Sequence, residues 1–313
     1  MGDGSAFRIE LQRVIFVVYP VFTLLFWFLY WRCWARVTRY LFGSRRARVI
    51  DGWSTLQHAC FYANANSCLH ACGVVILLCV MMATDSSLWS ERLHPHRNNI
   101  GHAAMSFSLA YFSFAIPWQW RLFFCMGERD AVNLPMVMHH VIVVLGILLY
   151  LLSSVCAPYG AIAFVCMEFT NWMFVPFTMM SQLGMEGSTA HQVVGVMLVL
   201  SFVSCRIIIC TWQAVKFTLD LSEFASDSGG EWAFVLMAYV VYLAALCLSW
   251  IWLKRVLLEC HAGVKDLLIQ IQKNRASVSP MRQDASHSRR IGIEGAPPQR
   301  TSVTSPTRTP SGV

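Results

Sequence analysis

Two adjacent histidines, His139 and His140, lie near one end of an otherwise apolar stretch, residues 134–155. Ionisable side chains are rare in membrane-spanning segments and usually mark functional sites there. A neutral imidazole can act as a general base there or can hydrogen-bond a neighbouring helix. Neighbouring side chains diverge by about 100° on a helix. We therefore expect His139, which shares a face with Val143 and Gly146, to line a cavity, and His140 to hydrogen-bond a neighbouring helix.

Further polar side chains occur at similar depths in other apolar segments. In residues 56–83, polar side chains recur every four residues in a stripe that includes His58. Residues 157–180 carry two polar side chains that are three positions apart, and residues 191–215 carry one arginine. We interpret these groups as a polar cavity that opens to the cytosolic leaflet. Packing histidines and a structural Glu168–Arg206 ion pair are the alternatives. The candidate cavity residues are His70, Asn66, His139, Glu168, Asn171 and Arg206.

The composition requires a membrane-embedded scaffold for these side chains. The chain has 313 residues, of which 56% are hydrophobic and only 13% charged, compared with about 25% charged in soluble proteins. About 20 apolar residues cross a bilayer. We predict an all-α, polytopic helical bundle with about seven transmembrane helices. They lie near 14–31, 56–83, 103–120, 135–155, 157–180, 191–215 and 232–253, and a short turn joins the fourth and fifth into an antiparallel hairpin.

The distribution of basic residues predicts the orientation of this bundle. The loop 32–54 holds six arginines against Asp51 alone, and the tail from Lys254 onward holds ten lysines and arginines against four acids. The positive-inside rule places both in the cytosol and the N-terminus in the lumen. We expect an anchor helix and basic loop at 1–50, the main transmembrane domain at 51–254, an amphipathic cytosolic helix at 255–275 and a disordered tail at 276–313.

Several classes of site and protein are disfavoured. The net charge of +7 comes from residues beside the membrane segments and in the tail, so no nucleic-acid partner is expected. The histidines of "LHPHRNNIGH", residues 93–102, lack a cysteine or carboxylate that would complete a zinc site, so we expect no metal. The His-x-x-His-His box of desaturases is missing because position 136 is methionine.

Four short motifs resemble the TLC domain, which is shared by ceramide synthases and translocation-associated membrane proteins. They are "NSCLHA" (66–71), "HHVIVVLG" (139–146), "EFTNWMFVPF" (168–177) and "SFVSCRIII" (201–209), and the resemblance extends from about Asp51 to Lys254. It implies His70, His139, Glu168, Asn171 and Arg206 as family positions. Ceramide synthases follow the double histidine with aspartates, whereas this chain has Glu168, Thr170 and Asn171, and Ala115 stands where many relatives carry aspartate.

The resemblance favours a non-enzymatic protein that binds, moves or senses membrane lipids, without a cofactor, in the endoplasmic reticulum. Sphingolipids are a class that it suggests, and a homo-oligomer is compatible with the sequence. The alternative is an acyl-CoA-dependent N-acyltransferase of the ceramide synthase type. In that case acyl-CoA would be the co-substrate, and His139 and His140 would be the catalytic candidates, with His139 as general base.

Overall fold

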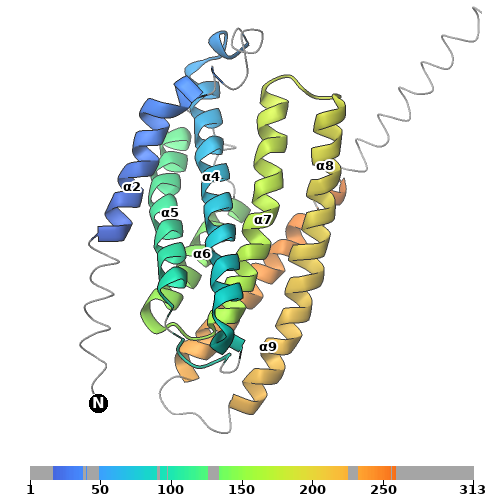
Figure 1. Ribbon diagram of the computed structural model, residues 1–313. Helices are drawn as coiled ribbons and strands as arrows, with labels where there is room; N and C mark the ends of the chain where they lie inside the picture. The colour runs from blue at the N-terminus through green and yellow to red at the C-terminus, as the bar shows by residue number, and fades with distance from the viewer. Residues whose placement is uncertain are drawn as a thin grey trace, which may run out of the picture. The chain divides into compact units, whose positions relative to one another are not determined.

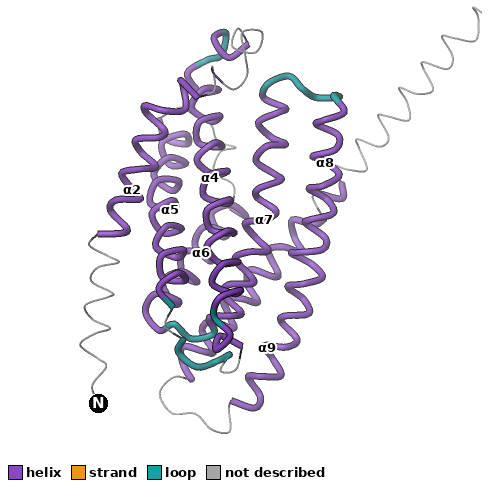
Figure 2. Tube along the Cα trace, viewed as in Figure 1, coloured by secondary structure: helices purple, strands orange, loops and turns teal. Residues whose placement is uncertain are grey.

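The computed structural model describes residues 17–37, 40, 49–89, 92–96, 98–125, 134–224, 232–254 and 256–258. The described residues are helical apart from short turns, and they contain no strand (Figure 2). The all-α prediction is therefore confirmed. The chain divides into two units after Val256. The predicted tail, and the predicted amphipathic helix beyond residue 258, lie outside the described residues.

The first half of the chain forms three long helical segments (Figure 1). Helix α2 (Tyr19–Phe28) continues into the π-helical turn η2 (Leu29–Cys33). Helix α4 (Thr55–Thr84) begins with a capping box, in which Ser54 and Gln57 satisfy each other's backbone N–H groups. After the short 3-10 helix η3 (Ser86–Trp89), α5 spans Asn99–Cys125. Asn98 starts α5 by accepting hydrogen bonds from the N–H groups of Ile100 and Gly101.

The described residues from Leu134 onward form four further segments. Helix α6 (Leu134–Ser153) is followed after a three-residue turn by α7 (Ala157–Gln182). Ser154 and Cys156 in that turn have positive φ angles of 55° and 56°. One continuous helical segment follows. It consists of α8 (Thr189–Ser201), the π-helical segment η5 (Phe202–Ile209) and α9 (Cys210–Phe224). A last helix covers 232–254.

Five of these helical segments are long and apolar enough to cross a membrane. They are Thr55–Thr84, Pro135–Ser153, Ala157–Gln182, Thr189–Phe224 and Trp232–Leu258, and five of the seven predicted spans fall on them. Helix α5, on the third predicted span, is not among the five. Many of its side chains are buried within the bundle, Ser106 and Ser108 among them. An interior helix meets less lipid and needs fewer apolar residues.

Helix α4 lies at the centre of the packing. It contacts α7 and α5 most extensively, while α2 covers the other side of α5 and α8 packs against α7 (Figure 1). By contrast, α6 and α7 contact each other little although a tight turn joins them. The predicted hairpin is therefore splayed. The space between its two helices is where the apolar pocket described below is found.

Candidate functional site

His70 lies in the middle of α4 and is held by two neighbouring helices. Its side chain is only 1% exposed. The Nε2 atom lies 3.1 Å from Ser108 Oγ on α5, and the Nδ1 atom lies 3.5 Å from Glu168 Oε2 on α7. The imidazole also stacks on Tyr111, with the ring centroids 4.2 Å apart and the planes 9° from parallel. These contacts fix the ring at the junction of α4, α5 and α7.

Asn171 connects Glu168 to Arg206. It lies one turn after Glu168 on α7, and its Nδ2 atom donates a hydrogen bond of 3.1 Å to Glu168 Oε2. Its Oδ1 atom accepts a bond of 3.0 Å from Arg206 Nη2. Among the described residues, Glu168 and Arg206 form no direct ion pair. The Asn171 amide bridges the two side chains instead, because one asparagine can donate a hydrogen bond to a carboxylate and accept one from a guanidinium at the same time.

Arg206 belongs to the π-helical segment η5 and is 3% exposed. Its Nε donates to Thr170 Oγ1, and its Nη2 donates to the carbonyl oxygen of Met167 at 2.8 Å as well as to Asn171. The guanidinium carbon lies 5.3 Å from the ring centroid of Phe202 and 5.2 Å from that of Trp252. Aromatic faces attract a cation at this distance. The arginine is thus buried against rings and amide oxygens, and π-helical turns of this kind occur frequently at functional sites.

His139 and His140 point to different neighbours from α6. Each is 8% exposed. His139 packs on Trp252 of the helix 232–254 with centroids 5.1 Å apart, and His140 meets Phe112 of α5 at 5.3 Å and 68°. The described part of the chain gives neither ring a hydrogen-bond partner. Within the described residues, the side chain that α5 presents to His140 is a phenylalanine, and the predicted interhelical hydrogen bond is not formed there.

The contacts around these residues close into a ring of side chains, which we call the polar circuit. His70 meets Phe112 at 5.7 Å, and His139 and His140 also lie 5.7 Å apart, so each member contacts the next. Five of the six predicted cavity residues are brought together here. The circuit consists of His70, Glu168, Asn171, Arg206, Trp252, His139, His140 and Phe112.

The sixth predicted residue, Asn66, has a different partner. Trp34 Nε1 donates to Asn66 Oδ1 at 2.6 Å, and Asn66 Nδ2 donates to the carbonyl oxygen of Phe26 at 3.0 Å. Both bonds attach α4 to the first helical segment. His58, the other polar residue of the stripe, lies 3.3 Å from the hydroxyl of Tyr62 one turn away. The periodicity of the stripe was visible in the sequence, but its residues serve separate contacts.

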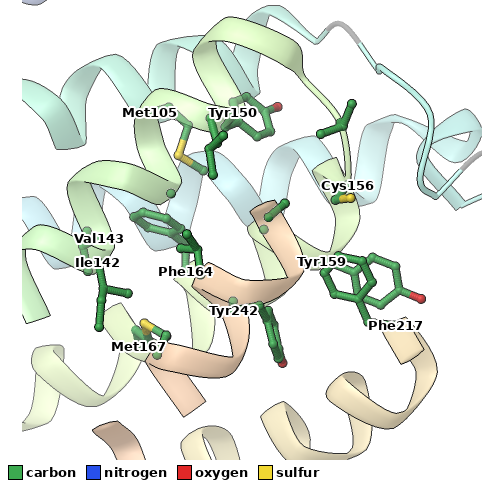
Figure 3. Close-up of a pocket in the computed structure, with 18 residues that line it drawn as sticks. Met105, Ile142, Val143, Tyr150, Cys156, Tyr159, Phe164, Met167, Phe217 and Tyr242 are labelled. Atoms are coloured by element: carbon green, nitrogen blue, oxygen red, sulfur yellow. The ribbon is translucent and has the colours of Figure 1, made fainter. Parts of the chain in front are cut away.

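An apolar pocket is lined by residues next to members of the polar circuit in the chain. Figure 3 shows the residues that line it. The pocket lies between α6, α7, α9 and the helix 232–254, and its empty space amounts to about 650 Å³, including the part open to the surroundings. Met167 lines the pocket with its side chain and accepts from Arg206 with its carbonyl group. Other lining residues are Val143, Gly146, Tyr150, Phe164, Tyr159 and Tyr242.

The pocket extends away from the side on which an opening was predicted. Val143 is one turn beyond His139 on α6, and the pocket continues from there toward Cys156 and Tyr159 at the α6–α7 turn. That turn lies at the end of the bundle predicted to be lumenal. The indole of Trp252 lies against both His139 and Arg206. The opening to the cytosolic leaflet stays a prediction. None of the six predicted cavity residues lines the apolar pocket.

The histidines of residues 93–102 have partners within the loops at that same end. His96 Nε2 lies 2.7 Å from Asp85 Oδ2, and Asn98 donates to the same oxygen. Hydrogen bonds from Ser87, His96 and Asn98 stabilise the charged form and lower the pKa of Asp85 below its ordinary value. His102 Nε2 lies 3.3 Å from Ser154 Oγ. Within the described residues, no three potential ligands gather around a metal position.

The sequence did not reveal several residues on which the site depends. Phe112 of α5 and Trp252 of the last helix complete the circuit, and Ser108 of α5 holds the ring of His70, yet serine, phenylalanine and tryptophan are ordinary in apolar segments. One signal was available. The arginine and the histidines in the apolar segments outnumber the single glutamate there, so some of them require aromatic or amide partners nearby.

The comparison with known families gives one match. A family model described as the TLC domain matches residues 60–258, which is more than half of the chain. The matched range contains every member of the polar circuit and every residue that lines the apolar pocket. No curated protein matches the chain.

Proposed function

Because the chain belongs to the TLC-domain family, we propose that this multi-pass membrane protein binds an acyl lipid and moves or senses it. The lipid's chain would occupy the apolar pocket, and its polar end would meet the polar circuit. The observation that carries the proposal is their continuity. Met167 contributes its carbonyl to Arg206 and its side chain to the pocket, and Val143 continues the face of His139 into the pocket. Sphingolipid homeostasis in the endoplasmic reticulum is the setting that we propose.

Gly146 offers a test of this assignment. It lines the pocket, and a Cβ atom added there would meet Val241 Cγ1 at 3.6 Å and Phe164 Cε2 at 4.0 Å, which are ordinary contacts. Alanine should therefore fit, whereas leucine should extend into the space for the acyl chain. We expect the purified protein to retain an acyl lipid that mass spectrometry of the extract identifies. Gly146→Ala should retain it, and Gly146→Leu should lose most of it.

Two outcomes would contradict the proposal. One is an extract that contains no lipid above the amount carried by an unrelated membrane protein purified in the same detergent. The other is Gly146→Leu carrying the same lipid in the same amount as Gly146→Ala. Thermal unfolding of both variants controls for loss of the fold, since a misfolded protein would lose lipid for a trivial reason.

One observation favours the enzymatic alternative. His139 has no hydrogen-bond partner in the described residues, so its imidazole is available to take a proton from an amine. Purified protein supplied with labelled acyl-CoA and long-chain bases tests this. An amide product that disappears with His139→Ala would establish an N-acyltransferase and overturn the non-enzymatic proposal. Lipidomics of cells that lack the protein, compared with cells that re-express His139→Ala, would show whether the same residue matters in vivo.

A further inference from the structure

Arg206 has unused hydrogen-bonding capacity in the interior of the bundle. Its Nε and Nη2 atoms are bonded to Thr170, Met167 and Asn171, whereas its Nη1 atom, with two N–H donors, has no partner among the described residues. Yet Nη1 is not among the fully buried polar atoms left unpaired, which in the described chain are Gln182 Oε1 and Thr211 Oγ1. The Nη1 atom is therefore not completely enclosed by protein atoms.

His139 lies beside this arginine with its own nitrogens unused. Both side chains contact the same indole, with His139 at 5.1 Å and Arg206 at 5.2 Å from Trp252. Arg206 is close enough to His139 to interact with it electrostatically. Both residues are more than nine-tenths buried. Two unpartnered groups, one of them a permanent cation and the other able to donate a hydrogen bond, thus meet at one place in the bundle.

The charges around this place favour an anion. Glu168 forms no direct ion pair with Arg206 in the described residues and is shared by Asn171 and His70. A buried guanidinium without a direct counter-ion is costly, and the planar fork of arginine matches a carboxylate especially well. The apolar pocket presents little besides hydrocarbon and aromatic surface, so it suits an unbranched chain and offers few partners for a large polar headgroup.

From these contacts we infer that Arg206 Nη1 and His139 bind the carboxylate of a long-chain fatty acid. Neither residue lines the apolar pocket itself, so the chain would pass Met167 and Val143 to enter it. The inference rests on the proposed lipid-binding function and specifies its ligand. A phosphate monoester is the other oxyanion with the same donor requirement, and it serves as a comparison ligand. A fatty alcohol of equal length has the chain without the anion.

The test is saturation binding of labelled palmitate to the purified full-length chain, with hexadecan-1-ol and hexadecyl phosphate as competitors. We expect hexadecan-1-ol to bind about 10- to 100-fold more weakly than palmitate, the range that corresponds to a lost hydrogen bond to a charged group. Arg206→Gln should weaken palmitate by a similar factor and leave hexadecan-1-ol within about twofold. Hexadecyl phosphate should compete more weakly than palmitate.

Arg121 supplies a matched control. Its guanidinium also lies over two tryptophan rings, at 5.5 Å from the centroid of Trp31 and 5.8 Å from that of Trp118. Arg121 is on α5 and does not line the pocket. Arg121→Gln should bind palmitate like the wild type. Should Arg206→Gln fail to fold, Arg206→Lys keeps the charge and loses the fork, and the wild-type preference for palmitate over the alcohol carries the same information.

The outcomes separate this inference from the proposed function. Equal affinities for palmitate and hexadecan-1-ol would overturn the carboxylate site. If Gly146→Leu then lost both ligands, the proposal that the pocket binds a lipid would still stand. Tighter binding of hexadecyl phosphate would overturn the carboxylate in favour of a phosphate. Binding of neither ligand above the Gly146→Leu background would overturn both proposals.

Discussion

The side-chain amide of Asn171 links two members of the polar circuit, so one substitution at this position interrupts the circuit. Asn171→Ala removes the bond to Glu168 at 3.1 Å and the bond to Arg206 at 3.0 Å. Hydrogen bonds between membrane helices average about 0.6 kcal/mol, and bonds to charged groups reach about 1.5–3 kcal/mol in other settings. Arg206 keeps Thr170 and the Met167 carbonyl. We therefore expect a loss of about 1–3 kcal/mol in the free energy of unfolding.

A double-mutant cycle distinguishes bridging from simple loss of packing. Denaturant titration in detergent would give the free energy of unfolding of Glu168→Gln, Arg206→Gln and the double variant. Each would be measured once with Asn171 in place and once in the Asn171→Ala background. If the amide transmits the interaction, the coupling energy between Glu168 and Arg206 should be above about 0.5 kcal/mol with it and smaller without it. As a control, Asn64→Ala removes an asparagine of α4 whose side chain makes no hydrogen bond within the described residues.

The bridging argument would be refuted by a coupling energy that is the same in both backgrounds. Strictly additive losses with Asn171 present would also refute it, because they would mean that the two charged side chains do not sense each other. An Asn171→Ala variant as stable as Asn64→Ala would show that the two hydrogen bonds contribute nothing.

Three further results are expected. Because its hydrogen bonds with Ser87, His96 and Asn98 lower the pKa of Asp85, the stability that this carboxylate contributes should be present above its unfolded pKa and lost as the pH falls toward its folded pKa. Asp85→Asn should therefore flatten the acid side of a melting-temperature profile. Gly101→Ala should cost about 1–3 kcal/mol of unfolding free energy, because a Cβ atom there would overlap the Tyr150 hydroxyl, whereas Gly146→Ala should melt like the wild type. Glycosylation-acceptor tags should be modified at the N-terminus and not at the C-terminus; a modified C-terminal tag would contradict the seven-span topology.

The helical architecture followed from the sequence because it depends on local properties. Length and hydrophobicity of a segment suffice to predict a membrane helix, since a lipid environment forces the backbone to satisfy its own hydrogen bonds. The start of α4 was less obvious, although Ser54 and Gln57 form a capping pair that can be found in sequence. Helix α5 is the exception in hydropathy, because its surroundings are protein rather than lipid, which no single segment reveals.

The candidate site was found only in part. Ionisable and amide side chains in apolar segments stand out in a sequence, and His70, His139, Glu168, Asn171 and Arg206 were selected in that way and meet in the structure. Their pairing was not predictable. Whether Arg206 meets Glu168 directly or through an amide depends on a few ångströms of helix rotation and on the wide turns of η5, which tertiary packing sets.

The apolar pocket was decided by tertiary structure alone. Val143, Gly146, Phe164 and Tyr242 are ordinary residues of apolar helices, and nothing in their order marks them as neighbours. The pocket exists because α6 and α7 splay apart after a three-residue turn while α9 and the last helix fill the gap incompletely. The sequence by itself determined which segments are helical and which carry costly polar groups, since burial in lipid penalises such groups wherever they occur. Only the packing of helices distant in the chain decided which of those groups touch and where space is left between them.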